Sequence, residues 1–402
     1  MMLTSDANKI LTQSDRVSLA WASRYKLTSV LVGLIAALLL GESLLQIALP
    51  SQSRYYVWQP NLQFTLHPNS EVLPGITGEA RFITNSAGIR GNEFAEGQTY
   101  RILAVGGSTT ECLYLDENET WPSLLEKRLI EERRTPIWVG NIGRSGRNTR
   151  DHILQLKYLL PQYPKIDAVI LLAGINDLHI RISDLKYDPL SPLRPTFEDE
   201  YKARAFAIVP SDQPLYHYTR LGWWRAAKRF KNIYFDKASD APVMDFTGAH
   251  FADWRRYRRN AEKIVEDLPD LTTALGEYRR NLEIIADTAQ RRSIRLLFVT
   301  QPTIWRSDLS KEETELLWMG GIGSFQLGKG HTYYSASSLE QAVRQYNATL
   351  LDVCRERAIE CVDLAGALPK DTTVFYDEVH FNESGARQVA EVLLKHIGSR
   401  LL

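Results

Sequence analysis

Short apolar segments alternate with amphipathic segments from residue 101 onward. Five apolar runs of strand length are separated by stretches whose apolar residues recur every three or four positions, as in a helix buried on one face. The runs at 167–173 and 294–300 are almost entirely apolar, as expected of strands covered by helices on both faces. The predicted strands are 102–106, 137–142, 167–173, 294–300 and 360–364, and the predicted helices are 119–133, 149–161, 272–291, 338–358 and 383–399.

Together these elements predict a three-layer α/β/α sandwich around a five-stranded, doubly wound parallel sheet. Two long stretches interrupt the alternation, at about 180–270 and 302–336, and both are polar and aromatic. Insertions of this length usually act as lids or binding surfaces, so we expect substrate specificity to lie there. Their tryptophans include Trp223, Trp224, Trp254 and Trp305.

One part of the first insertion, RLGWWRAAKRFK at 220–231, combines Arg and Lys with Trp and Phe. A basic amphipathic segment of this kind can lie on a membrane surface or contact a polyanion. The alternative is a partly solvated helix packed against the core, and this is the interpretation that we favour from the sequence.

The longest apolar run, at 27–49, is long enough to cross a bilayer as one transmembrane helix, although Glu42 and Gln46 make its second half more polar. Basic residues before the run predict, by the positive-inside rule, a cytoplasmic N-terminus at 1–26. Everything after the run is then extracytoplasmic. The basic residues are Arg16, Arg24 and Lys26.

A cleaved signal peptide is the main alternative to an anchor, but no clear small-x-small site follows the apolar run before Pro50. A soluble-core helix is also possible, but 30–40 has no polar face. We therefore expect a single-pass protein of a bacterial inner membrane, with its large domain on the periplasmic or outer side. A proline-containing stalk and lead-in at 50–96 precedes the sandwich domain at 97–402.

Composition restricts the possible partners. The 402 residues, 44% of them hydrophobic, can bury a full core. Equal numbers of basic and acidic residues, 48 of each, give no field that would attract nucleic acid. Cys112, Cys354 and Cys361 lack the spacing of a zinc site, and Cys354 and Cys361 either pair in an oxidising compartment or serve as small apolar side chains. The histidines show no metal-binding pattern, so we expect no metal and no organic cofactor.

Polar residues follow three predicted strands, at the edge where the carboxyl ends of parallel strands meet. Ser108 lies in GGST after the first strand, Gly146 in NIGRSGRNT after the second, and Asn176 in AGINDL after the third. Near the C-terminus, Asp377 precedes His380 by three residues in YDEVHFNESG. Each motif alone is also compatible with an ordinary turn or helix cap.

These residue types together suit acyl transfer. A serine becomes a nucleophile when a histidine accepts its proton, and a carboxylate orients that histidine and stabilises its charged form. Ser108, His380 and Asp377 supply the three groups. The oxyanion that forms on an attacked carbonyl needs donors already aimed at it. We expect these donors to be the backbone N–H groups of Ser108 and Gly146 and the side-chain amide of Asn176.

In this order, the blocks GGS, N-x-G-x-S-G, G-x-N-D and D-x-x-H resemble the four signature blocks of the SGNH (GDSL-type) hydrolase family. The resemblance spans about 100–180 and 360–400 and implies a flavodoxin-like core sheet. It also implies the roles of five residues: nucleophile for Ser108, oxyanion donors for Gly146 and Asn176, and the remaining triad members for Asp377 and His380.

One position departs from the family pattern. The frequent Gly-Asp-Ser reads Gly106-Gly107-Ser108 here, so that any support from the Asp side chain is missing. Glu111 and Glu378 lie close in sequence to the proposed nucleophile and base, and we expect both to be solvated neighbours.

The resemblance implies a serine-dependent esterase or deacetylase that forms an acyl-Ser108 intermediate and passes the acyl group to water. The anchor and the aromatic insertions favour an O-acylated glycan at the cell envelope as substrate. One alternative is an O-acetyltransferase for an exopolysaccharide or cell-wall glycan with the same triad. Another is a catalytically inactive, membrane-tethered glycan-binding protein, since a fold does not guarantee an activity.

Overall fold

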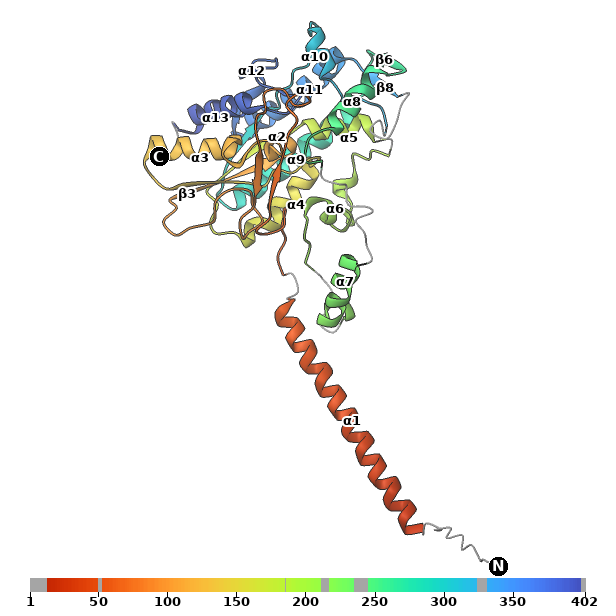
Figure 1. Ribbon diagram of the computed structural model, residues 1–402. Helices are drawn as coiled ribbons and strands as arrows, with labels where there is room; N and C mark the ends of the chain where they lie inside the picture. The colour runs from red at the N-terminus through yellow and green to blue at the C-terminus, as the bar shows by residue number, and fades with distance from the viewer. Residues whose placement is uncertain are drawn as a thin grey trace, which may run out of the picture. The chain divides into compact units, whose positions relative to one another are not determined.

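The computed structural model describes residues 13–49, 53–184, 186–210, 217–234, 245–323 and 331–398 (Figure 1). The chain divides into a smaller unit, residues 1–53 and 210–243, and a larger unit, residues 54–209 and 244–402. Part of the predicted cytoplasmic segment, Pro50 and parts of both predicted insertions lie outside the described residues.

The larger unit is built on a five-stranded parallel sheet with the strand order β4-β3-β5-β7-β9. Each predicted strand is present and ends within two residues of its predicted bounds. In the centre, Leu103 of β3 lies opposite Gly140 of β4 on one side and Val169 of β5 on the other. The strands are β3 (Tyr100–Gly106), β4 (Ile137–Asn141), β5 (Ala168–Leu172), β7 (Arg295–Val299) and β9 (Glu360–Val362).

Helices cover both faces of this sheet, which confirms the predicted three-layer fold. The chain passes from β3 to β4 in one direction and from β4 to β5, β7 and β9 in the other. Right-handed crossovers therefore place the helix after β3 on one face and the helices of the later crossovers on the opposite face. Accordingly, α3 packs beside α13 (Figure 1), whereas α9 packs against both α4 and α11. The helices are α3 (Trp121–Arg133), α4 (Thr149–Leu159), α9 (Thr272–Arg291), α11 (Ala336–Arg357) and α13 (Glu383–Gly398), all within two residues of prediction.

The predicted insertions contain regular structure of their own. Strand β6 (Lys263–Val265) from the first insertion pairs in parallel with β8 (Thr332–Tyr334) from the second, so the two insertions meet. Helix α7 (Gly222–Tyr234) belongs to the smaller unit, and the other insertion helices belong to the larger. These are α6 (Phe197–Ala205), α8 (His250–Arg259) and α10 (Lys311–Glu315), while α5 (Ile175–Ser183) begins before the first insertion and ends in it.

Most of the segment predicted as a stalk and lead-in folds as part of the larger unit, which begins at residue 54. Strands β1 (Gln63–Leu66) and β2 (Ala80–Ile83) form an antiparallel pair. Arg90 is almost completely buried, and a buried guanidinium needs its donors satisfied. Its partners include the Glu117 carboxylate and the carbonyl oxygens of Glu111, Cys112 and Leu115, which lie in or after the helix that carries Ser108.

Helix α1 (Gln13–Ala48) contains an apolar stretch, Thr28–Ala48, that is long and apolar enough to cross a membrane. None of this stretch is buried by protein, whereas the helix of a soluble core is covered on its apolar face. The stretch is therefore a candidate membrane span or signal sequence.

Cys354 near the end of α11 and Cys361 in β9 form a disulfide, with their Cα atoms 6.2 Å apart. Cys112 is free and buried. Of the two interpretations left open by the sequence, the structure has the paired one. Disulfides persist in oxidising compartments, which fits an extracytoplasmic domain.

Thiol titration of denatured, unreduced protein tests the disulfide. We expect one reactive thiol per chain, that of Cys112, and three after reduction. In a Cys112→Ser control, no thiol should react before reduction. Three reactive thiols in protein purified from its native compartment would contradict the pairing.

Candidate functional site

Ser108 is the first residue of the short helix α2 (Ser108–Glu111), immediately beyond the carboxyl end of β3. Two glycines make this tight turn possible. A Cβ on Gly106 would collide with the Thr110 hydroxyl, and one on Gly107 would collide with the side-chain amide of Asn176. Gly107 thus leaves room for Asn176, which gives the departure from Gly-Asp-Ser a physical role.

Neighbouring side chains fix the backbone of this turn. The indole N–H of Trp121 donates to the Thr109 carbonyl oxygen at 3.1 Å, and the Asn141 amide donates to that of Thr110 at 2.7 Å. Both donors are buried. A hydrogen bond that is shielded from water resists exchange with solvent, so the hydroxyl of Ser108 is carried by a well-supported backbone.

Asp377 and His380 lie in the loop between α12 (Leu364–Ala367) and α13. Oδ1 of Asp377 accepts the backbone N–H groups of Val379 at 2.9 Å and His380 at 2.7 Å. This is a local Asx-type turn, in which a carboxylate replaces a backbone acceptor. The turn leaves Oδ2 to face the imidazole of the same loop.

The side chains of Ser108, His380 and Asp377 form one continuous hydrogen-bonded chain. Nε2 of His380 lies 2.7 Å from the Ser108 hydroxyl, and Nδ1 lies 2.6 Å from Asp377 Oδ2. Ser108 and His380 are 272 residues apart in sequence, so the fold makes this contact. Asp377 is fully buried and Ser108 is partly exposed, as a substrate-facing hydroxyl must be.

The buried carboxylate is held in its ionised form. Burial alone raises the pKa of Asp377, but attraction to His380 and the hydrogen bonds from His380 and from the Val379 N–H outweigh it. The pKa of Asp377 therefore lies below its ordinary value. An ionised carboxylate at this position can stabilise a positively charged imidazole.

Asn176 lies in the first turn of α5, with its side-chain amide next to Gly107, and Gly146 lies in the loop between β4 and α4. Nδ2 of Asn176 donates to the Arg147 carbonyl oxygen at 2.8 Å, which leaves its second N–H for another acceptor. Gly146 is exposed and has a φ of +72°, a conformation that favours glycine. The backbone N–H groups of Ser108 and Gly146 make no hydrogen bond to another described residue.

Buried carboxyl groups connect the loops that carry these donors. Asp177, next to Asn176, accepts the backbone N–H of Thr149 at 3.2 Å and also its hydroxyl. Glu111 accepts the hydroxyl of Ser145. Glu111 was expected to be solvated but is buried, because Ser145 satisfies the carboxyl inside the protein. Burial raises the pKa of Glu111, and it raises that of Asp177 to about 7.

Sequence reasoning missed Trp318, which comes from the second insertion. Its indole N–H donates at 2.9 Å to Asp377 Oδ2, the same oxygen that accepts His380 Nδ1. Glu378, also expected to be solvated, is fully buried and accepts the backbone N–H groups of Trp318 and Met319. Burial raises the pKa of Glu378 to about 7. No local pattern marks these contacts, because the partners are about 60 residues apart.

Aromatic rings surround the imidazole of His380. The ring centroids of Tyr376 and Phe251 lie 5.4 and 5.8 Å away, and Trp318 lies parallel to the imidazole at 6.4 Å. Trp254, which is partly exposed, packs on Trp318 at 4.8 Å. Of the insertion tryptophans singled out from the sequence, Trp254 is thus next to the site. Trp305 is buried in the core, and Trp223 and Trp224 lie on α7 in the smaller unit.

The histidines outside this cluster show no arrangement for a metal. His152 is buried with Nδ1 2.9 Å from Gln155 Oε1, and burial lowers the pKa of His179 to about 4. Within the ranges that the structure describes, no group of three or more His, Cys, Asp or Glu side chains is placed to hold an ion. The absence of metal and cofactor remains a prediction.

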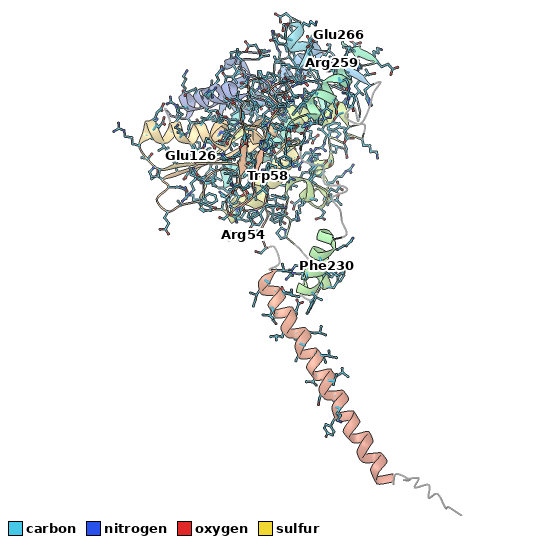
Figure 2. All side chains as sticks on the ribbon, viewed as in Figure 1. Arg54, Trp58, Glu126, Phe230, Arg259 and Glu266 are labelled. Carbon is cyan, nitrogen blue, oxygen red and sulfur yellow. A yellow bond between two sulfur atoms is a disulfide. The ribbon has the colours of Figure 1, made fainter. Side chains whose placement is uncertain are left out.

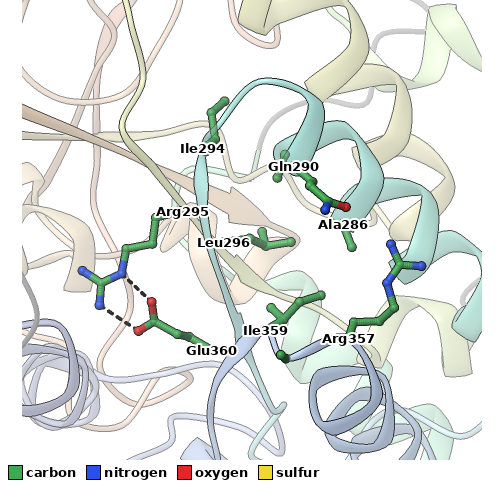
Figure 3. Close-up of a pocket in the computed structure, with 10 residues that line it drawn as sticks. Ala286, Gln290, Ile294, Arg295, Leu296, Arg357, Ile359 and Glu360 are labelled. Carbon is green, nitrogen blue, oxygen red and sulfur yellow. Dashed lines mark hydrogen bonds and ion pairs between the residues drawn. The ribbon is translucent and has the colours of Figure 1, made fainter.

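A pocket away from these residues lies at the opposite edge of the sheet (Figure 3). Its lining includes Ile294 and Arg295 at the amino end of β7 and Glu360 at the amino end of β9. Figure 3 shows Arg295 bound to Glu360 through two hydrogen bonds, of 2.6 and 2.7 Å. Ser108 lies at the carboxyl end of β3, so this pocket is separate from the candidate site.

Residues 104–388 match the model of the GDSL-like lipase/acylhydrolase family. The match covers more than half of the chain and includes all the residues of the candidate site. The chain therefore belongs to the GDSL-like lipase/acylhydrolase family, which confirms the resemblance seen in the sequence. It is an enzyme of the class that acts on ester bonds, as a hydrolase or an acyltransferase. No curated protein matches the sequence.

Three solved structures illustrate the similarity. LAE5, an alpha/beta hydrolase enzyme from the metagenome of Lake Arreo, Spain, is 15% identical, with 75% of this chain and 96% of that chain covered and a TM-score of 0.39. Axe2, an acetylxylan esterase from Geobacillus stearothermophilus, is 14% identical (75% and 95% covered, TM-score 0.38). A lipolytic protein of the G-D-S-L family from Veillonella parvula DSM 2008 is 14% identical (75% and 100% covered, TM-score 0.39).

Proposed function

We propose that this chain is a serine-dependent acyl-ester hydrolase that works through an acyl-Ser108 intermediate. The hydrogen-bonded chain from Ser108 through His380 to Asp377 carries this proposal. The nucleophile, the base and the orienting carboxylate each occupy the position that the chemistry requires. Membership of an acylhydrolase family supports the same reaction class.

The first half of the reaction forms the acyl-enzyme. His380 Nε2 takes the proton of the Ser108 hydroxyl as Oγ attacks the ester carbonyl. The carbonyl oxygen becomes an oxyanion and accepts hydrogen bonds from the N–H groups of Ser108 and Gly146 and from the Asn176 amide. When the tetrahedral intermediate collapses, the bond to the alcohol oxygen breaks, and the imidazolium of His380 gives its proton to that oxygen.

The second half releases the acyl group. Water gives a proton to His380 and attacks the acyl carbonyl, and the same donors hold the second oxyanion. Collapse breaks the bond to Ser108 Oγ, which regains its proton from His380. Asp377 stays ionised throughout and stabilises the imidazolium in both halves.

We place the enzyme at the cell envelope, anchored by α1 with the larger unit outside the cytoplasm. The length and apolar character of Thr28–Ala48 support an anchor, and the Cys354–Cys361 disulfide supports an oxidising compartment. Arg16, Arg24 and Lys26, which precede the span, support an inside N-terminus.

We further propose an O-acylated glycan as the substrate. Trp254 is partly exposed and packs on Trp318, whose ring lies parallel to that of His380. A partly exposed indole near a reacting centre can contact the apolar face of a sugar ring. An envelope location brings such glycans within reach of the site.

Labelling with a fluorophosphonate probe tests the nucleophile. The wild-type chain should be labelled at Ser108. The Ser108→Ala variant should not be labelled, and its esterase kcat should be lower than that of the wild type by about 10⁴-fold or more. Ser307→Ala, which removes an exposed hydroxyl, is the matched control and should react like wild type. An unlabelled wild type without activity would favour the inactive glycan-binding protein.

A product assay separates hydrolysis from acyl transfer. The protein is given an acetyl ester donor together with candidate oligosaccharides, and free acetate and acetylated sugar are both measured. Because water completes the proposed reaction, free acetate should equal the donor consumed. Acetylated sugar with little free acetate would reject plain hydrolysis and favour the O-acetyltransferase.

A further inference from the structure

Helix α7 begins against the second half of α1, within the smaller unit. The Glu42 carboxylate accepts the backbone N–H of Gly222 at 2.7 Å and that of Trp223 at 3.1 Å. The first N–H groups of a helix have no acceptor within the helix, so Glu42 satisfies two of them. A negative charge at this end also suits the helix dipole.

Side chains of α7 reach the backbone of α1. The indole N–H of Trp223 donates to the Leu38 carbonyl oxygen at 3.2 Å, and Arg225 Nε donates to that of Leu49 at 2.8 Å. Arg225 also donates to the Gln46 side chain at 2.6 Å. Glu42 and Gln46, which make the second half of the apolar run more polar, therefore both bind α7.

The rest of α7 exposes large apolar side chains. Trp224 is 45% exposed and Phe230 is 56% exposed, and Figure 2 shows Phe230 on α7. Large exposed apolar side chains grouped on one element mark an interaction surface. The stretch 220–231 also contains five Arg or Lys residues and no Asp or Glu, so the surface suits an anionic partner.

We propose that α7 lies in the lipid–water interface of the membrane that α1 enters, with its aromatic side chains at the boundary and its basic side chains among anionic headgroups. The helix is attached to the candidate span, whose apolar side chains from Val30 to Leu40 are exposed and need lipid. Trp is enriched at such interfaces, and basic amphipathic helices bind anionic lipid there. This inference rests on the proposed membrane anchoring.

The sequence alone favoured packing of 220–231 on the sandwich core. The structure instead assigns α7 to the unit that contains α1. The local pattern could not reveal this, because the partner residues in α1 are about 180 positions away.

Quenching by spin-labelled lipid tests the position of α7. The full chain with Cys112→Ser and the native disulfide is placed in vesicles of phosphatidylcholine and phosphatidylglycerol that carry nitroxide lipids. An environment-sensitive fluorophore is attached at Ala227→Cys, which lies one helical turn from both Trp224 and Phe230. Leu34→Cys in the span and Leu190→Cys, exposed in the larger unit, are the matched comparisons.

We expect quenching at position 227 close to that at position 34 and several-fold above that at position 190. Quenching at 34 without quenching at 227 would overturn the interfacial helix and leave the anchor standing. A lack of quenching at both positions would overturn the anchor and this inference together. Neither outcome depends on catalysis, so the proposed reaction is tested separately.

A second inference, carried by a different contact, concerns Trp318. We infer that Trp318 is a positioning residue for Asp377, fixing the carboxylate that orients His380. Asp377 Oδ2 accepts from both the Trp318 indole and the His380 imidazole. The backbone of Trp318 is itself fixed by Glu378, and Arg258 donates to the adjacent Met319 carbonyl oxygen.

Because Asp377 Oδ2 accepts from two donors, loss of the Trp318 indole N–H changes both the charge that faces His380 and the orientation of the carboxylate. The negative charge on Asp377 Oδ2 is shared between the indole N–H and the imidazolium. Loss of the indole N–H therefore strengthens the hydrogen bond between Oδ2 and the imidazolium. At the same time the carboxylate loses one of the contacts that fix its orientation.

Trp318→Phe tests this role, with Trp254→Phe as the control that removes an indole from the same cluster without touching Asp377. For Trp318→Phe we expect kcat to fall by about tenfold with little change in KM, because the ring is kept and only the N–H donor to Asp377 is lost. Trp254→Phe removes no hydrogen bond to Asp377 and should change KM for a glycan substrate more than kcat. Equal kcat values for wild type and Trp318→Phe, or a change in KM alone, would overturn the inference, while the Ser108→Ala result bears only on the proposed function.

Discussion

The hydrogen bond between the Ser108 hydroxyl and His380 Nε2 joins two loops at one edge of the sheet, and the proposed chemistry depends on it. One loop follows β3, which lies between β4 and β5 in the sheet, and the other precedes the last helix, α13. Neither loop can make the contact alone. The parallel sheet brings them together because its strands all end at the same edge, where the connecting loops gather.

Buried polar groups fix the positions of the segments at this edge of the sheet. Glu111, Asp177 and Glu378 each place a carboxyl inside the protein, where it accepts hydrogen bonds from a neighbouring loop. Burial raises the pKa of all three, so their charge is costly and their partners must stay in place. Arg90, in the lead-in segment, also donates hydrogen bonds to the carbonyl oxygens of Glu111 and Leu115, which follow Ser108 in the chain. The site is therefore supported by long-range contacts as well as by its own loops.

Periodicity and motif order predicted the part of this structure that depends on local sequence. The five strands and five main helices each show a clear pattern, and the four blocks mark the loops that carry Ser108, Gly146, Asn176 and the Asp377–His380 turn. The sequence could not reveal the contacts made across long separations. Trp318 and Glu378 showed no local signal, the pairing of β6 with β8 joins two irregular insertions, and the burial of Arg90 needs partners about 20 residues away.

Family membership defines the reaction class, and the geometry of the site supports a covalent serine mechanism within that class. Trapping of the acyl-enzyme tests this claim most directly. The full chain is mixed with an excess of an acetyl ester, stopped with acid within one turnover, and digested for mass spectrometry. We predict one acetyl group on the peptide that contains Ser108, and none in the Ser108→Ala variant. Steady turnover with no acetylated peptide, or with acetylation at another residue, would contradict the mechanism.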